Sequence, residues 1–300
     1  MKVTTDLIKQ LRDITMAGMM DCKKALEACE CNIEKAIVWL REKGIAKAEK
    51  KAVRVAAEGL CSFAINGNEC VLFELNSETD FVAKNAKFLG LLDKVSNIIL
   101  NSNATNTEEA LAIDVEGKTL ETVILEESSV IGEKISLRRV SRIVKTDAQT
   151  FGAYKHMGGR IAVITILENA DEAVAKDIAM HVAANQPLYV SQEDISTETI
   201  EKEKAIILTE ALNENAKAAK PKPEHIIANN IVPGRLAKYL KEISLVDQPF
   251  VKNPDETVSV YLSHTKSTVK SFTRLAVGEG IEKEVVDFAA EVAAQAGLNK

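Results

Sequence analysis

The feature that most restricts the fold is an order of elements that occurs twice: two strand-like runs followed by an amphipathic helix. In the first copy the runs lie at residues 61–65 and 70–75 and flank Asn66-Gly67, a dipeptide typical of tight β-hairpins. A helical pattern follows at residues 81–100. A hairpin of this kind has one apolar face, and the helix that follows is the natural cover for that face.

The second copy uses strand-like runs at residues 136–145 and 159–167, joined by a loop that contains glycine, and a helix at residues 171–186. Both helical patterns contain the tripeptide Val-Ala-Lys, at residues 82–84 and 174–176. A three-residue match is weak evidence, but the shared order of elements predicts an internal repeat. We therefore expect an α+β fold with two repeated hairpin-plus-helix core subdomains.

Three short helical patterns precede the first copy, at residues 5–15, 22–29 and 33–43. Gly44 stands where a helix C-terminus is expected, and the basic stretch 45–54 then predicts a solvated linker. Because the apolar residues of each pattern share one face, the three helices can form a small bundle.

A charged insertion follows the second copy at residues 191–244. Its two helical patterns carry narrow apolar stripes and are joined by a polar turn at Pro221 and Pro223, which predicts a protruding antiparallel helical hairpin. Pro233-Gly234 should kink or break the second arm, because proline removes a backbone donor.

The remaining segments complete the expected organisation. A strand-like run lies at residues 257–263, and an amphipathic pattern after Gly278 predicts a C-terminal helix. The expected parts are an N-terminal helical module and linker (1–54), core subdomain N (55–145), core subdomain C (146–190 and 245–277), the inserted helical hairpin (191–244) and a C-terminal helical module (278–300).

Composition and charge exclude several classes of protein. The net charge is −6 and aromatic residues make up 4% of the chain, so neither the basic patch nor the stacking surface of a nucleic-acid binder is expected. No run approaches the roughly 18 uncharged apolar residues that indicate a membrane helix. The N-terminus lacks a secretory segment. We therefore expect a cytoplasmic protein that contacts neither nucleic acid nor membrane directly.

The motifs predict no catalytic centre, metal site or cofactor site. The phosphate-loop pattern GxxxxGK[ST] and the nucleophile elbow are absent, and the five cysteines contain no CxxC pair. His181 lies inside a helical pattern, which favours a core or interface position. His156 lies in a glycine-containing loop beside Arg160, where a side chain could be displayed, but an ordinary hairpin loop is favoured over catalysis.

The stretch NSETDFVAKNAK, residues 76–87, leaves one question open. Ser77 or Thr79 can cap the helix that begins here. On a continuous helix Phe81 falls within about 20° of Phe88, so periodicity favours a core position for the ring. The alternative is that the first turn projects beyond the sheet and presents Phe81 to another protein as an aromatic anchor. Spacing alone does not decide between the two interpretations.

Several collinear segments resemble the elongation factor Ts family, the nucleotide-exchange factors of elongation factor Tu in bacterial translation. Residues 76–85 are similar to the family's TDFV core motif, and residues 11–29 resemble its N-terminal module. The three-helix pattern of that module also resembles ubiquitin-associated (UBA) domains. Further similar segments follow in the family's order: IGEKISLRRV (131–140), AMHVAANQP (179–187), DQPFVKNP (247–254) and VGEGIEKEVVDFAAEVAAQ (277–295).

The resemblance implies a mechanism and a set of residues. The ring of Phe81 would wedge between side chains of elongation factor Tu near its Mg²⁺ site, and Asp80 would fix the approach through hydrogen bonds. Magnesium coordination would be disturbed and GDP would lose contacts. The residues implied are Thr79, Asp80, Phe81 and Val82 at the partner's nucleotide-binding domain, with His156, Gly159 and Arg160 of the family's YxHxxGR pattern as a supporting interface.

The same resemblance implies further contacts. The N-terminal module and the C-terminal helix would contact the partner's nucleotide-binding domain, and the second half of the core would face its other domains. The helical hairpin joins copies into dimers in some family members, which leaves a homodimer open. Exchange needs no covalent step, so no enzymatic activity is expected. The alternative function is a non-enzymatic binding or scaffold protein that uses the UBA-like module.

Overall fold

The computed structural model describes residues 3–15, 17–51, 54–218 and 220–282 of the chain. Helices and sheets are both well represented, which confirms the predicted α+β class. The chain divides into two compact units, and each is described by itself. Unit 1 comprises Met1–Ala64, Phe73–Arg142 and Ala276–Lys300, and unit 2 comprises Ile65–Leu72 and Ile143–Leu275. The domain boundaries expected from the sequence stay a prediction.

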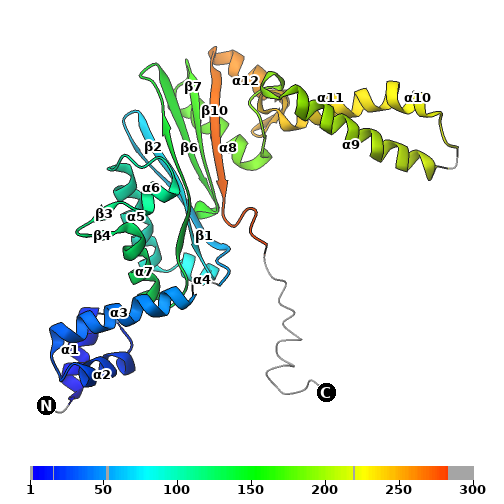
Figure 1. Ribbon diagram of the computed structural model, residues 1–300. Helices are drawn as coiled ribbons and strands as arrows, with labels where there is room; N and C mark the ends of the chain where they lie inside the picture. The colour runs from blue at the N-terminus through cyan, green and yellow to red at the C-terminus, as the bar shows by residue number, and fades with distance from the viewer. Residues whose placement is uncertain (1–2, 16, 52–53, 219, 283–300) are drawn as a thin grey trace, which may run out of the picture. The chain divides into compact units, whose positions relative to one another are not determined.

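Unit 1 begins with three helices, α1 (Thr5–Thr15), α2 (Met19–Ala28) and α3 (Ile33–Lys51) (Figure 1). Asn32 caps α3, because its side-chain oxygen accepts the Lys35 N–H at 2.8 Å. The buried side chains of the bundle come from all three helices: Ile8, Leu11, Cys22, Ala25, Leu26 and Ala36.

The predicted end of the third helix at Gly44 is wrong, since α3 continues to Lys51. The residues that follow are mostly Ala, Lys and Glu, which favour helix and outweigh one glycine. Gly44 instead allows a close approach to another helix: a Cβ there would stand 2.6 Å from Ser129 Oγ. A glycine that permits close packing therefore looked, in sequence, like a helix stop.

The first sheet has the order β1-β2-β5, formed by Glu58–Asn66, Glu69–Ser77 and Ser136–Val144. Gly67, with φ +57°, lies in the predicted turn between β1 and β2. Helices α5 (Ala86–Leu100) and α7 (Leu120–Ile131) lie beside this sheet (Figure 1). Between them are α6 (Thr107–Leu111) and the short strands β3 (Asp114–Val115) and β4 (Lys118–Thr119).

The second sheet has the order β10-β7-β6, formed by Thr268–Ala276, Ile161–Glu168 and Gln149–His156. The prediction that residues 136–145 pair with 159–167 is wrong, because β5 joins the first sheet and β6 takes its place. The β6 segment looked like a loop in sequence partly because it contains Gly152. That glycine serves packing: a Cβ there would stand 1.9 Å from the Ala175 carbonyl oxygen of α8 (Glu172–Asn185).

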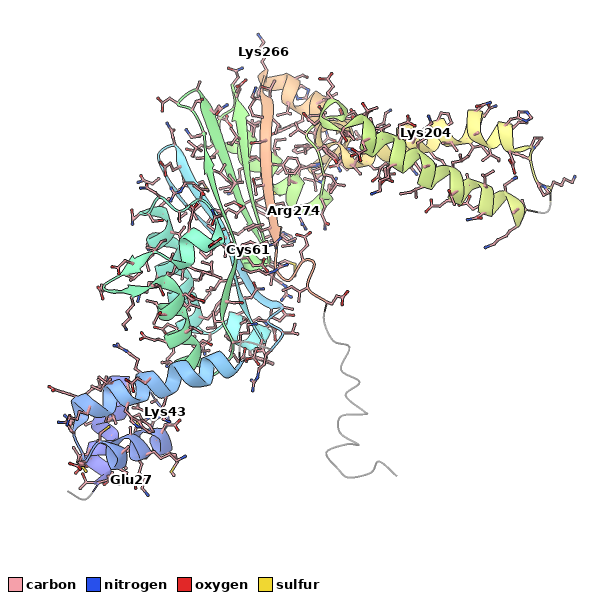
Figure 2. All side chains as sticks on the ribbon, viewed as in Figure 1. Glu27, Lys43, Cys61, Lys204, Lys266 and Arg274 are labelled. Atoms are coloured by element: carbon pink, nitrogen blue, oxygen red, sulfur yellow. The ribbon has the colours of Figure 1, made fainter. Side chains whose placement is uncertain are left out.

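The helical hairpin of unit 2 has one long arm, α9 (Thr197–Ala216), and an interrupted arm (Figure 1). The interrupted arm runs through α10 (Glu224–Ile226), the π-helical turn η3 (Ile227–Ile231) and α11 (Val232–Ile243). The chain widens into a π turn before Pro233 and does not break there, so the missing proline donor is accommodated. Lys204 projects from α9 (Figure 2), and its side chain is 49% exposed.

The strand predicted at residues 257–263 is wrong: this segment forms α12 (Val258–Thr265). The strand β9 (Asn253–Thr257) ends at the residue before α12 and pairs with β8 (Pro249–Phe250). Thr257 caps the helix by accepting the Val260 N–H at 3.4 Å. Val258 and Leu262, four residues apart, are buried while Val260 is exposed, so the burial period is that of a helix despite the β-branched residues.

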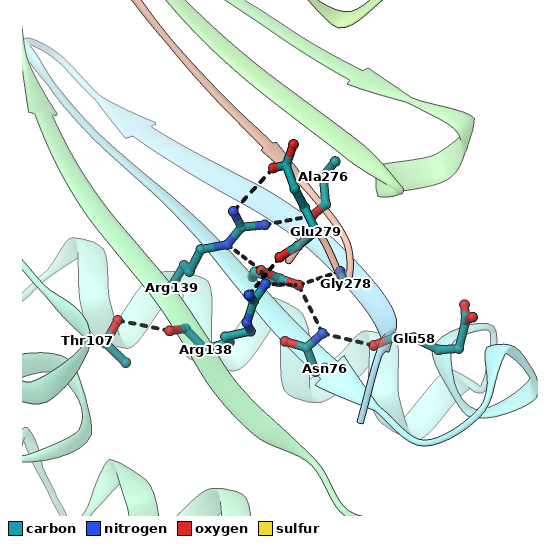
Figure 3. Close-up of polar contacts among 9 residues, drawn as sticks. Glu58, Asn76, Thr107, Arg138, Arg139, Ala276, Gly278 and Glu279 are labelled. Carbon is teal, nitrogen blue, oxygen red and sulfur yellow. Dashed lines mark hydrogen bonds and ion pairs between the residues drawn. The ribbon is translucent and has the colours of Figure 1, made fainter. Parts of the chain in front are cut away.

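A buried carboxylate ties the end of the described chain to the first sheet of unit 1. Glu74 of β2 is fully buried and accepts the Gly278 N–H at 2.8 Å, Asn76 Nδ2 at 2.9 Å and Arg138 Nη1 at 3.0 Å. It also forms an ion pair with Arg139 Nε. Figure 3 shows both arginines reaching toward the turn at Gly278.

The same two arginines also bind backbone carbonyl oxygens of the turn at residues 276–279. Arg139 Nη2 donates to the Ala276 carbonyl oxygen at 2.6 Å, and Arg138 Nη2 donates to that of Glu279 at 2.7 Å (Figure 3). Gly278 has φ +72°, and a Cβ there would stand 2.3 Å from the Ala57 carbonyl oxygen. Most of the predicted C-terminal helical module, residues 283–300, lies outside the described residues.

The described part of the chain also contains three short 3₁₀ turns: η1 (Met157–Gly159), η2 (Gln192–Asp194) and η4 (Leu245–Asp247). Within the described ranges, none of the helices is long and apolar enough to cross a lipid bilayer.

Candidate functional site

The aromatic side chain of Phe81 is 81% exposed, more than any other large apolar side chain in the described part of the chain. It lies in α4 (Asp80–Ala83), a single helical turn that directly follows β2. Thr79 is the N-cap residue of this turn, and its hydroxyl oxygen accepts the Val82 N–H at 3.4 Å. The cap predicted from the sequence is therefore confirmed.

The periodicity argument that favoured a core position for Phe81 is wrong, because the helix is not continuous. The chain leaves α4 at Lys84, and Asn85 adopts extended backbone angles of φ −73° and ψ 138° before α5 begins. Phe81 and Phe88 therefore belong to two separate helices, and only Phe88 is buried. Val82 and Ala83 are 9% and 5% exposed, so α4 is packed on the unit by its other face while the ring of Phe81 points outward.

Asp80 precedes the ring and forms an ion pair with Lys84, with 2.7 Å between Oδ2 and Nζ. The two side chains are 42% and 74% exposed. An exposed pair one helical turn apart contributes only about 0.3–0.5 kcal/mol. The contact between Asp80 and Lys84 therefore adds little to the stability of α4.

A second loop, at the end of α7, contacts the residues just before Phe81. Glu133 accepts hydrogen bonds from Thr79, and Glu78 accepts one from the backbone of Lys134. Residues 131–140 are among the segments that resemble the family, but no motif predicted a role for Glu133 or Glu78. Their sequence separation of more than 50 residues, 54 for the Thr79–Glu133 contact, left no local signal that could have found them.

His156, Gly159 and Arg160 lie at the β6–β7 connection of unit 2, whereas residues 79–82 belong to unit 1. His156 ends β6 and is half-buried, with its Nδ1 3.3 Å from the Tyr154 hydroxyl. Gly159 is buried with φ +107°, and Arg160 is exposed. Met157, for which no motif predicted a role, is 69% exposed and has φ +49°. This connection thus presents an apolar side chain beside the predicted histidine.

The described part of the chain contains no group of three or more His, Cys, Asp or Glu side chains able to hold a metal ion. His181 is buried in α8, where Nδ1 accepts the Val251 N–H at 3.1 Å and Nε2 lies 2.8 Å from Gln248 Oε1. Burial lowers the pKa of His181, although the Gln248 contact opposes the shift. His181 therefore links α8 to residues 248–251, as the core interpretation predicted.

Comparisons with known proteins agree on one family. The family model described as elongation factor TS matches residues 78–279, about two thirds of the chain. The curated elongation factor Ts of Acholeplasma laidlawii (strain PG-8A) is 55% identical over 296 residues, which cover 98% of this chain and 99% of that protein.

The chain belongs to the elongation factor Ts family.

The matched region of the chain includes Glu78, Phe81 and Glu133, as well as His156 and Arg160. The N-terminal three helices lie before it, but the relative from Acholeplasma laidlawii aligns over nearly the whole chain. Family membership makes the chain a translation elongation factor and confirms the resemblance found in the sequence. The roles of the individual residues stay predictions.

Proposed function

We propose that this chain binds elongation factor Tu in its GDP form and promotes GDP release by disturbing the Mg²⁺ and phosphate site of that partner, so that GTP can bind. The observation that carries the proposal is the 81% exposure of Phe81 on a support whose neighbours Val82 and Ala83 are buried. A folded chain exposes a phenyl ring on a rigid support at a cost, since the apolar surface stays in contact with water. Burial against a partner recovers that free energy.

Phe81 is the wedge in this proposal, and Asp80 directs it. A desolvated aromatic anchor at an interface contributes about 2 kcal/mol or more. The Asp80 carboxylate is 42% exposed and would accept hydrogen bonds from the partner. Thr79 caps the N-terminus of α4, and the buried side chain of Val82 packs α4 onto the unit. His156 and Arg160, with Gly159 shaping the turn, form a second contact from the β6–β7 connection.

The proposed role is one of binding, and it requires no chemical step by this chain and no cofactor. Release follows from linkage: if the factor weakens GDP binding to the partner, GDP weakens factor binding by the same ratio. Couplings of about 1–3 kcal/mol change affinity roughly 5- to 150-fold. The proposed setting is the cytoplasm, with elongation factor Tu as the partner and neither nucleic acid nor membrane as a direct ligand.

Release of a fluorescent GDP analogue from elongation factor Tu tests the proposal directly. The wild-type chain is expected to accelerate release in proportion to its concentration until the partner is saturated. Co-purification of the two proteins should be strongest without nucleotide and weaken when GDP is added. A chain that binds elongation factor Tu equally well with and without GDP, and leaves the release rate unchanged, would refute the proposal.

The N-terminal module supplies a third proposed contact. Met19 and Met20 at the start of α2 are 54% and 63% exposed, and Ile14 at the end of α1 is 55% exposed. Replacing Met19 and Met20 together by serine is expected to raise the factor concentration needed for half-maximal GDP release at least about fivefold, since contact area is lost. The limiting rate should change little, because Phe81 is intact, and titration of the release rate separates the two effects.

The same variant distinguishes the alternative function, a binding or scaffold protein that uses the UBA-like module. In that case Met19→Ser/Met20→Ser would abolish partner capture, whereas Phe81→Ala would leave it unaffected. The exposed apolar residues of α1 and α2 are the observation that favours this alternative.

A further inference from the structure

Two loops of unit 1 exchange hydrogen bonds next to Phe81. The Thr79 N–H donates to Glu133 Oε2 at 2.9 Å, and the Thr79 hydroxyl donates to Glu133 Oε1 at 2.7 Å. In return, Glu78 Oε1 accepts the Lys134 N–H at 2.6 Å. We call these four residues, Glu78, Thr79, Glu133 and Lys134, the carboxylate clamp. Each loop thus contributes one carboxylate as an acceptor and donates hydrogen bonds to the carboxylate of the other loop.

The loop that carries Glu133 is itself fixed. Gly132 ends α7 in the left-handed region with φ +96°, and its N–H donates to the Ser128 carbonyl oxygen at 2.9 Å. The Ser128 hydroxyl donates to the Glu133 carbonyl oxygen at 2.5 Å and accepts the Ile135 N–H at 3.3 Å. Ser128 is buried. Glu133 therefore reaches Thr79 from a braced helix end.

The other carboxylate is braced as well. Arg54 Nη1 lies 3.1 Å from Glu78 Oε2, and Lys134 Nζ donates to the Arg54 carbonyl oxygen at 2.9 Å. The Glu78 side chain is 18% exposed, so it is held largely away from water. Glu78 and Glu133 therefore belong to one network that connects residues 54, 78–79 and 133–134.

The contact to Thr79 has a consequence for the helical turn that carries Phe81. With its proton directed to Glu133, the Thr79 hydroxyl presents a lone pair to the Val82 N–H, which it accepts at 3.4 Å. A four-residue helix cannot stabilise itself, because the first turn costs more conformational entropy than its hydrogen bond returns. The position of Phe81, two residues after Thr79, therefore depends on the clamp.

We propose that Glu133 is a positioning residue for nucleotide exchange: by holding both donors of Thr79 it fixes α4 in the orientation that presents the Phe81 ring. The inference rests on the proposed function, since it assumes that Phe81 enters the partner. Glu133 itself does not touch the partner's nucleotide site. Its contribution is to remove the freedom of the ring before binding, which lowers the entropy cost of association.

The test is the variant Glu133→Gln, measured with fluorescent GDP on elongation factor Tu. Glutamine keeps the size of the side chain but has one acceptor oxygen, so one of the two Thr79 donors is lost together with the negative charge. We expect GDP release at sub-saturating factor to slow about tenfold, the size of one hydrogen bond to a charged group. Glu121→Gln, at an exposed position of α7, the helix that precedes Glu133, is the matched control and should behave as wild type.

A double variant separates positioning from simple loss of stability or direct contact. In a chain that already carries Phe81→Ala, Glu133→Gln is expected to cause no further loss of exchange, because the ring that it positions is gone. A further tenfold loss in that background would overturn the proposal, since Glu133 would then act without Phe81. Equal exchange by Glu133→Gln and wild type would overturn it too.

Thr79→Val provides a second route if Glu133→Gln lowers the melting temperature strongly. It removes only the hydroxyl end of the clamp, keeps the volume of the side chain, and is expected to slow exchange in the same direction. Unchanged exchange by a folded Thr79→Val chain counts against the clamp. If Phe81→Ala has no effect on exchange, the proposed function fails; if Phe81→Ala slows exchange and the clamp variants do not, only the present inference fails.

Discussion

Replacing Phe81 by alanine is expected to slow GDP release from elongation factor Tu about 30-fold or more while leaving the melting temperature of the chain unchanged. The factor corresponds to about 2 kcal/mol, the usual contribution of a desolvated aromatic anchor. No cavity forms in the free chain, because the ring is 81% exposed. Alanine also has the higher helix propensity, so α4 should not be weakened.

Phe88→Ala is the matched control for this prediction. Phe88 stands seven residues later, in α5, and is completely buried. Its removal should cost about 3–5 kcal/mol of unfolding free energy, because a cavity is left in the core. The two variants are compared by thermal unfolding and by GDP release at a temperature where both are folded. A fall in the melting temperature of Phe81→Ala comparable to that of Phe88→Ala would contradict the exposed position of the ring.

Glu74→Gln is expected to lower the free energy of unfolding at pH 7 by about 3 kcal/mol. Glu74 is fully buried and faces two arginines whose side chains are each 28% exposed. Removing one partner of a buried ion pair costs about 3–5 kcal/mol, and the partial solvation of the arginines places the effect at the lower end. The glutamine would also direct its NH₂ group at arginine or amide N–H groups, which cannot accept a hydrogen bond.

Glu279→Gln is the matched control, because Glu279 contacts Arg139 in the same cluster at 3.4 Å but is 50% exposed (Figure 3). An exposed ion pair contributes at most about 1 kcal/mol. Urea unfolding of the wild type, Glu74→Gln and Glu279→Gln measures the free energy of unfolding of each. Equal losses for Glu74→Gln and Glu279→Gln would show that burial of Glu74 does not decide the energetics.

The stabilisation that Glu74 gives the folded chain should decrease at low pH. Burial by itself raises the pKa of Glu74, but donation by the Gly278 N–H, Asn76 and Arg139 outweighs it and lowers the pKa below 4.5. A carboxyl group with a lowered pKa in the folded state stabilises the fold fully above its ordinary pKa and loses that contribution as pH falls through the folded value. The difference between wild type and Glu74→Gln should therefore narrow below about pH 4.5.

Local signals in the sequence predicted several elements correctly, and the reasons are local. Asn66-Gly67 turns the first hairpin through a positive φ at Gly67. Asn32 caps α3, and Thr79 caps α4, through hydrogen bonds to residues three positions later. The helical hairpin follows from its two narrow apolar stripes, which meet in a small core around Ile207 and Val232.

Two kinds of wrong prediction, at the glycines and at β5, share a different cause, which is distant packing. Gly44 and Gly152 looked like breaks, but each allows a close approach to a helix far away in sequence. The strand β5 joined the first sheet because pairing is decided by the partner available in three dimensions. The segment 257–263 has β-branched residues, yet a threonine cap and the buried pair of Val258 and Leu262 make it helical.

The sequence by itself determined the α+β class and the family, because each depends on patterns and motifs that are continuous along the chain. Only the tertiary structure decided that Phe81 is exposed. A break of the helix at Lys84 and Asn85 reorients the ring, and residues 54 positions apart in sequence brace it through Thr79 and Glu133. Helical periodicity assumes one unbroken axis, so it cannot report the direction of a side chain once a new cap, here Asn85 at the start of α5, has interrupted the helix.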